Sequence, residues 1–169
     1  RDLPPKELHA FRRSLTLVTL KGDQVKSNGE KYIADFLFEH GIEFEYEKVF
    51  DWKTSFDGEI NYRPDFLILA NGKDYILEHW ALNPNNPISK LPEYWDTTAK
   101  QYRQQIDEKR SYWKDKPEQL IETHSQMLGQ GREFFEQKLK DILTQVGIKC
   151  ERLPQDIIID RVFNSHPDI

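Results

Sequence analysis

Three acidic residues stand at positions where a folded protein rarely keeps an uncompensated charge. They are Glu30, early in an expected helix, Asp65, directly after Pro64, and Glu78, at the end of an apolar run. A carboxylate at the end of an apolar strand is retained only if something offsets its desolvation. A divalent cation does so, and a cation held between carboxylates is typical of sites that hydrolyse phosphodiester bonds. The spacing therefore predicts a Mg²⁺ or Mn²⁺ site.

Asp65 and Glu78 are the centre of this prediction. They lie six residues before Asn71 and six after Gly72, and Asn-Gly is a strong hairpin signal. Pairing of the two strands places the carboxylates side by side, where like charges are destabilising unless a metal or a shared proton intervenes. The alternative is that both acids are exposed on a sheet edge.

Glu30 has a competing structural explanation. Ser27 followed three residues later by Glu30 is the pattern of a capping box at a helix start. On local evidence the capping role is favoured, and a catalytic role for Glu30 depends on Asp65 and Glu78.

Apolar periodicity and turn residues predict an α/β fold with a mixed sheet flanked by helices. The order is helix, three-strand meander, helix, strand, helix. The expected elements, in chain order, are a short helix and an apolar strand within 5–20, a helix from 28 to Gly41, strands at 42–46, 62–70 and 74–81, a loop at 82–93, a helix at 94–114, a strand at 120–123, a helix at 131–146, and a last strand at 148–153.

Composition bounds the class of protein. The 169 residues predict one domain at 24–153, with an extension at 1–23 and a tail at 154–169. The lone Cys150 fits a reducing compartment, and no apolar run is long enough for a bilayer, so a cytoplasmic protein (nucleoid-associated if prokaryotic) is expected. The chain opens without Met, which suggests a piece of a larger protein.

The net charge of −5 argues against nucleic-acid binding by bulk electrostatics alone. It does not argue against a metal-dependent enzyme, because cations neutralise active-site acids and local basic patches still hold phosphates. Lys and Arg cluster at 100–116, although a charge run of this kind is usually a solvated helix face.

Five segments of the chain carry a family resemblance. They are Val25-Lys26-Ser27-x-x-Glu30, Gly41-Ile42-x-Phe44-x-Tyr46-Glu47, Arg63-Pro64-Asp65-Phe66, Glu78-His79 and Leu120-Ile121-Glu122-Thr123. In this order they resemble the PD-(D/E)XK nuclease superfamily, and most closely the nuclease-like modules of superfamily 1 helicases of the UvrD/Rep and helicase IV type. The resemblance covers roughly residues 24–150. It implies a restriction-endonuclease-like fold and linkage to helicase domains in DNA repair.

The resemblance also implies a ligand set. Asp65 and Glu78 would bind Mg²⁺ or Mn²⁺ with the backbone carbonyl of His79, and Glu30 would bind through water. The side chain of His79 itself is expected on the opposite face of the strand.

The chain departs from the family pattern at Trp80, where a catalytic lysine is expected. Either catalysis is lost and a binding role is kept, or the cation comes from elsewhere. Lys109 shares one face of the following helix with Gln105 and Tyr102 and is assigned the lysine's role. The alternative for Lys109 is an ordinary surface lysine.

The remaining assignments concern substrate. Tyr102 and Gln105 are expected to support the substrate phosphate or the lysine, and Arg103 and Arg110 are fallback cations. Trp95, Tyr112 and Trp113 suit base stacking, although aromatics at helical spacing more often pack in a core.

The sequence thus predicts a metal-dependent nuclease acting on DNA. A catalytically silent nucleic-acid-binding or scaffold module of a helicase is the alternative, and an RNA-processing or resolvase-like nuclease stays open.

Overall fold

The computed structural model describes residues 17–48, 62–93, 95 and 97–166. The chain divides into two compact units. Unit 1 comprises Arg1–Glu43 with Gln130–Ile169, and unit 2 comprises Phe44–Gly129. Most of the helix and strand expected within residues 5–20 lies outside the described residues, and Val18 forms only an isolated bridge with Gln24. The predicted domain boundaries stay a prediction.

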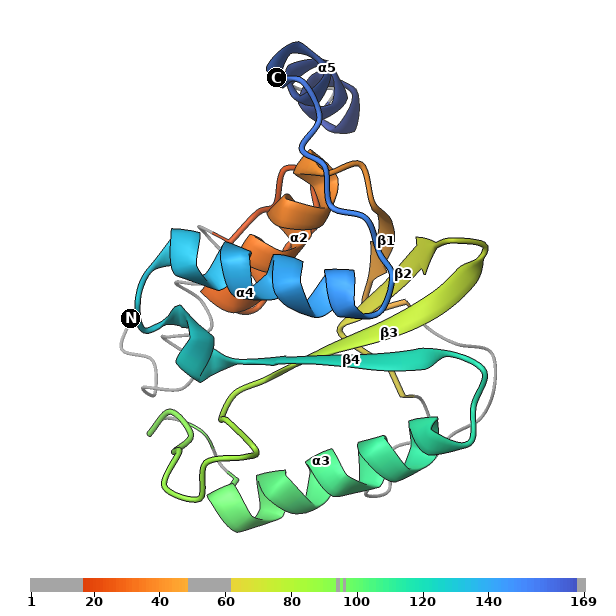
Figure 1. Cartoon of the computed structure of the whole chain (residues 1–169). Coiled ribbons are helices and arrows are strands. Elements are labelled where there is room, and N and C mark those ends of the chain that lie inside the picture. The colour runs from red at the N-terminus through yellow and green to blue at the C-terminus, as the bar shows by residue number, and fades with distance from the viewer. Residues whose placement is uncertain (1–16, 49–61, 94, 96, 167–169) are drawn as a thin grey trace. The chain divides into compact units, whose positions relative to one another are not determined.

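Unit 1 is built on two packed helices, α2 (Asn28–Glu39) and α4 (Arg132–Gln145), which lie side by side in Figure 1. Both were predicted within one residue at their starts. Their buried apolar stripes repeat at helical spacing and supply the packing. The fully buried members are Ile33, Ala34 and Leu37 from α2 and Phe135, Leu139 and Leu143 from α4.

The last strand predicted at 148–153 is wrong. This segment has no regular structure, although Ile148 and Cys150 are buried in the alternating way that suggested a strand. Its backbone instead makes two hydrogen bonds at its ends, in which the Ile148 N–H donates to the Leu143 carbonyl at 3.0 Å and the Leu153 N–H donates to the Glu39 carbonyl at 2.8 Å. The predicted tail contains a further helix, α5 (Gln155–Ser165), which buries Ile158.

A four-stranded sheet lies in unit 2, apart from Glu43, the first residue of its first strand. Its strands are β1 (Glu43–Tyr46), β2 (Phe66–Ala70), β3 (Lys73–Trp80) and β4 (Gln119–His124), in the order β1-β2-β3-β4. β2 and β3 are antiparallel, whereas β3 and β4 are parallel. The predicted α/β class and mixed sheet are therefore confirmed.

The hairpin between β2 and β3 turns at Asn71 and Gly72, as predicted. Their φ angles of 55° and 71° are both positive, which is the conformation that two-residue hairpin turns require. β2 begins at Phe66, four residues later than predicted. Pro64 lacks the N–H that a ladder position needs, which accounts for the late start.

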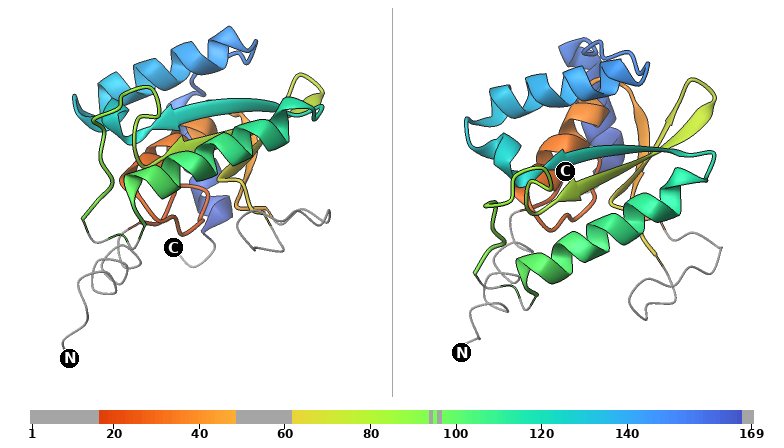
Figure 2. Two further views of the ribbon diagram at one scale, coloured as in Figure 1. Left: turned by 90° about the horizontal axis from the view of Figure 1, so that it is seen from below. Right: turned by 60° about the horizontal axis from the view of Figure 1, so that its bottom comes forward.

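One helix, α3 (Ala99–Lys114), packs on the sheet of unit 2, and Figure 2 shows it beside β3 and β4. The predicted start at 94 is wrong, because Thr98 and Gln101 form a capping box that begins the helix at Ala99. Trp113 packs with Leu67 and Ile76 against the sheet. Among the described helices, none is long and apolar enough to cross a membrane.

Candidate active site

Asp65 and Glu78 lie side by side in unit 2. Phe66 pairs with Leu77 at the end of the β2–β3 ladder, so the two acids occupy the next opposed positions. The Asp65 Oδ2 accepts a hydrogen bond from the His79 N–H at 2.7 Å. Asp65 is half-buried and Glu78 is only 2% exposed. The alternative of two exposed edge acids is therefore excluded.

Burial disfavours the charged forms of both acids. Burial, followed by the negative charge of Glu78, raises the pKa of Asp65 well above its usual range, against the His79 N–H and the charge of Lys109. Burial likewise raises the pKa of Glu78, although Lys109 and a hydrogen bond from Tyr62 lower it. The pair has an electrostatic deficit that a cation would remove.

The buried Tyr62 hydroxyl binds Glu78, and the buried Trp113 indole binds that hydroxyl. The sequence did not reveal either role. The Tyr62 hydroxyl donates to Glu78 Oε1 at 2.6 Å and accepts from Trp113 Nε1 at 3.1 Å. Burial and the Glu78 charge raise the pKa of Tyr62, so the phenol stays protonated and keeps donating. Tyr62 adjoins the Arg63-Pro64-Asp65 segment, but only the folded sheet brings it to Glu78.

Lys109 is the cation that the structure brings to the acids. Its Nζ lies 5.5 Å from the Tyr62 ring centroid and 5.8 Å from that of Trp80. Its charge lowers the pKa of both Asp65 and Glu78. The ammonium that α3 supplies therefore acts electrostatically on both acids, whereas a catalytic role for Lys109 stays a prediction.

Trp80 fills the space beneath α3 where the family pattern would place a lysine. It is 2% exposed and packs with Leu82 and Ile106. Its indole Nε1 donates to Glu122 Oε1 at 2.8 Å. Arg110 Nε donates to the same oxygen at 2.6 Å, so this fallback cation is already ion-paired.

Two further predicted substrate residues make internal contacts. The Tyr102 hydroxyl accepts from the Ala81 N–H at 2.9 Å, and its ring packs on the Trp80 cluster. Arg103 donates to three backbone carbonyls of the loop after β3, those of Pro84, Asn86 and Ser89. Gln105 is half-buried. Substrate roles for these residues stay predictions beside their structural ones.

His79 points to the other face of β3, as expected. Its Nδ1 lies 2.8 Å from Thr123 Oγ1, and burial, then the nearby His124, lower its pKa to about 4. The imidazole is therefore neutral near pH 7. Ligation of a metal by the His79 carbonyl stays a prediction.

The two remaining acids of interest belong to different units. In unit 1, Ser27 Oγ accepts from the Glu30 N–H at 3.1 Å, while Glu30 Oε1 accepts from the Lys26 N–H at 2.9 Å. The capping role is confirmed, although Glu30 accepts from the N–H of Lys26 and not from that of Ser27. Metal binding by Glu30 stays a prediction.

In unit 2, Glu47 donates its N–H to the Asp65 carbonyl at 2.9 Å, and its charge also raises the pKa of Asp65. The sequence placed Glu47 only in a motif.

No protein-family model, curated protein or solved structure matches this chain. Within the part of the chain that the structure describes, no group of three or more His, Cys, Asp or Glu side chains is arranged to hold a metal ion. The acid pair with its lysine is therefore the feature of unit 2 from which a function is argued.

Proposed function

We propose that this protein is a Mg²⁺- or Mn²⁺-dependent nuclease domain that hydrolyses phosphodiester bonds of DNA. The observation that carries the proposal is the adjacent carboxylates of Asp65 and Glu78 with the Lys109 ammonium beside them. Burial has raised the pKa of both acids, and perturbed carboxylates with a specific charge partner are common at functional sites. DNA as substrate, the restriction-endonuclease-like fold and linkage to helicase domains rest on the motif resemblance.

The donor set fits a hard divalent cation. Mg²⁺ is commonly held by one or two carboxylates and completes its shell with waters and substrate phosphates. Two protein carboxylates therefore suffice, with the His79 carbonyl as a further ligand in the proposal. When bound, such an ion lowers the pKa of a water and polarises the phosphoryl oxygens.

The protein's own residues have separable roles in this proposal. Asp65 and Glu78 hold the ion, and the Tyr62 hydroxyl keeps one Glu78 oxygen in place. Lys109 stabilises negative charge on the phosphate or orients the attacking water. Trp80 supplies no charge and instead packs under α3, where it forms one wall of the space around the Lys109 ammonium.

A cleavage assay tests the proposal. Single-stranded, double-stranded and branched DNA are incubated with the chain and Mg²⁺ or Mn²⁺. We expect Asp65→Ala or Glu78→Ala to abolish cutting and Asp74→Ala, an exposed acid on the same strand, to retain it. Lys109→Ala should slow cutting at least about tenfold, whereas Lys100→Ala, exposed on the same helix, should not. Undiminished cutting by Asp65→Ala would refute the assignment of the acid pair as the catalytic metal site.

A catalytically silent binding module of a helicase is the second candidate. The buried Trp80 favours it, as does the lack of a three-residue metal cluster among the residues described. Titration with Mn²⁺ separates the two, because an ion that binds only the folded state raises the melting temperature. A nuclease shows that rise, and a silent module shows neither binding nor stabilisation.

A further inference from the structure

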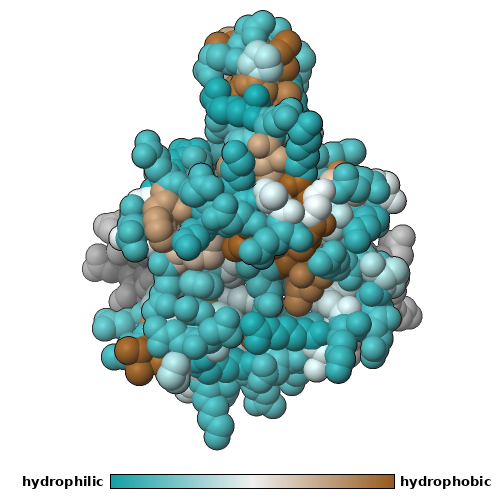
Figure 3. All heavy atoms as spheres, viewed as in Figure 1, coloured by the Kyte–Doolittle hydropathy of each residue, from teal (hydrophilic) through white to brown (hydrophobic). Residues whose placement is uncertain are grey.

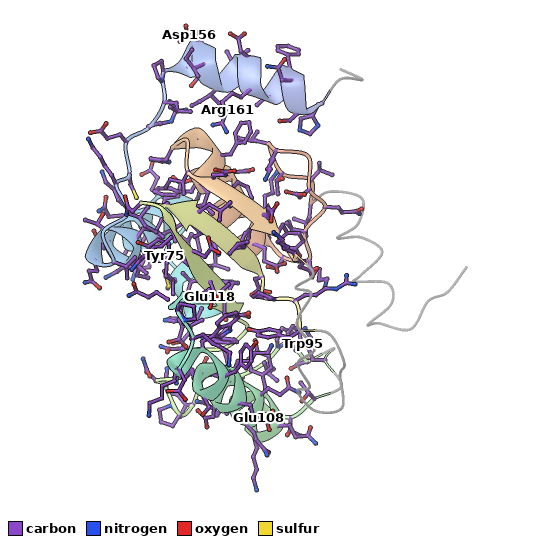
Figure 4. All side chains as sticks on the ribbon, turned by 90° about the vertical axis from the view of Figure 1, so that its right-hand side faces the viewer. Tyr75, Trp95, Glu108, Glu118, Asp156 and Arg161 are labelled. Carbon is purple, nitrogen blue, oxygen red and sulfur yellow. The ribbon has the colours of Figure 1, made fainter. Side chains whose placement is uncertain are left out.

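Unit 2 carries a pocket of about 580 Å³ at the C-terminal end of α3, away from the acid pair. It is formed by the last turn of α3, the turn into β4 and the start of β3, and Figure 4 labels Glu118 between α3 and β4. The charged residues that line it are Lys73, Arg110, Lys114, Lys116 and Glu118. The pocket is thus cationic in a protein whose net charge is −5.

The described residues that line the pocket carry four cationic side chains and one carboxylate. Arg110 is neutralised by Glu122 at 2.6 Å. Lys73 and Lys116 lie 5.0 and 4.4 Å from the ring centroids of Tyr75 and Tyr112, which order the ammonium groups without cancelling their charge.

The three lysines Lys73, Lys114 and Lys116 are exposed, and none of them forms an ion pair with another described residue. Against them stands the one carboxylate of Glu118, whose Oε2 has no hydrogen-bond partner in the described part of the chain. A lysine in the last turn of a helix is explained by the helix dipole. That accounts for Lys114 but not for Lys73 at the start of β3 or for Lys116 in the turn after α3.

The pocket and the acid pair share their scaffold. Trp113 lines the pocket, and its indole donates to Tyr62, which in turn donates to Glu78. Lys73 lies five residues before Glu78 on β3, which corresponds to about 17 Å along a strand. Because five is an odd number, side-chain alternation places Lys73 and Glu78 on opposite faces of β3, so the pocket and the acid pair are separate sites.

We infer that this pocket binds backbone phosphates of the nucleic acid at a place separate from the acid pair, an inference that rests on the proposed function. Lysine ammonium groups bind phosphates as point charges and without sequence preference. Lys73 begins β3, whereas Lys114 ends α3 and Lys116 follows it by two residues, and a row of separate ammonium groups suits an extended polyanion better than one compact anion. The surface around α3 is largely hydrophilic, as Figure 3 shows, which suits a phosphate backbone rather than an apolar partner.

The test is equilibrium binding without divalent metal, so that no cutting occurs. Fluorescence anisotropy follows a labelled 30-bp duplex and a 30-nucleotide single strand over about 50–250 mM KCl, where each lost phosphate contact lowers the slope of log K against log salt by about 0.9 on duplex DNA and 0.7 on a single strand. We expect Lys114→Gln/Lys116→Gln to lower the duplex slope by about 1.8 and to weaken binding roughly ten- to hundredfold at 0.1 M salt. Lys138→Gln/Lys140→Gln, exposed on α4, removes the same charge and should leave the slope unchanged.

The outcomes separate the pocket from the catalytic proposal. The inference would be overturned if a pocket variant that melts like wild type kept the wild-type slope of log K against log salt. It would also be overturned if the wild-type chain bound no nucleic acid. Titration calorimetry with inorganic phosphate tests whether the pocket binds the free anion instead of a nucleic-acid backbone. Phosphate binding that Lys114→Gln/Lys116→Gln abolishes while the nucleic-acid slope stays constant also overturns the inference. Pocket-dependent binding by a chain that never cuts supports the pocket and refutes the nuclease.

Discussion

The acid pair makes a quantitative prediction about stability. Asp65→Asn removes one of two adjacent charges and keeps the oxygen that accepts from the His79 N–H. Two like charges about 4 Å apart repel by about 4 kcal/mol at an effective dielectric constant near 20. Lys109 offsets part of this repulsion in the wild type, so we expect a net gain of about 2 kcal/mol. For a chain of this size that is about 4–8 °C in melting temperature.

The gain should depend on pH with a defined sign. The folded protein raises the pKa of Asp65, so it binds that proton more tightly than the unfolded chain does. Wild-type stability therefore falls as the pH rises from about 4, the unfolded pKa, through the raised folded value. The difference between Asp65→Asn and wild type should be near zero below about pH 4 and largest at alkaline pH. His79, with its pKa lowered to about 4, contributes the opposite slope up to about pH 6.5 and cancels in the difference.

Thermal melts followed by circular dichroism from pH 4 to 9, in EDTA, measure this difference. Asp74→Asn, exposed on β3, is the matched control and should shift the melting temperature little at any pH. Adding Mn²⁺ should stabilise the wild type, by about 2.7 kcal/mol at a hundredfold excess over Kd, and not Asp65→Asn. A variant less stable than wild type at pH 8, or a difference independent of pH, would refute the electrostatic argument.

Three further predictions concern the surroundings of the pair. Tyr62→Phe removes a hydrogen bond that lowers the pKa of Glu78, so the acidic limb of a pH–rate profile should move to higher pH; an unmoved limb contradicts the Tyr62 role. Trp80→Lys restores the family pattern but buries a charge, so urea unfolding should show a loss of about 3 kcal/mol or more, with no faster cutting; a stable, faster enzyme would contradict this. Arg103→Ala removes the hydrogen bonds to three loop carbonyls, so limited proteolysis should cut within residues 83–89 sooner than in Arg103→Lys. Equal cleavage rates in the two variants would show that Arg103 does not stabilise this loop.

Local patterns predicted most of the secondary structure. Ser27 and Asn71-Gly72 are local signals whose physics acts over a few residues, and α2 and the hairpin form where they indicate. The errors arose where a local pattern was ambiguous. The alternating burial of Ile148 and Cys150 suits a strand as well as an irregular segment packed on a core, and only the presence of a pairing strand separates the two.

The candidate site was predictable in part. The positions of Asp65 and Glu78 follow from the hairpin register, because turn type determines which residues oppose each other. Lys109 followed from helical spacing and the family pattern, although its approach to the pair depends on the packing of α3. Tyr62 and Trp113 could not be assigned, since nothing in their spacing shows that the phenol donates to Glu78 and that the indole donates to the phenol.

The sequence by itself determined that two carboxylates meet at one end of a hairpin, since strand pairing is a short-range property of the chain. Only the tertiary structure decided what surrounds them. Packing of α3 on the sheet buries Glu78, places Trp80 beneath the helix and brings the Lys109 charge close enough to act on both acids. The same packing brings Lys73 of β3 beside Lys114 and Lys116 at the end of α3, because contacts between distant residues depend on how the elements pack and not on the order of residues along the chain.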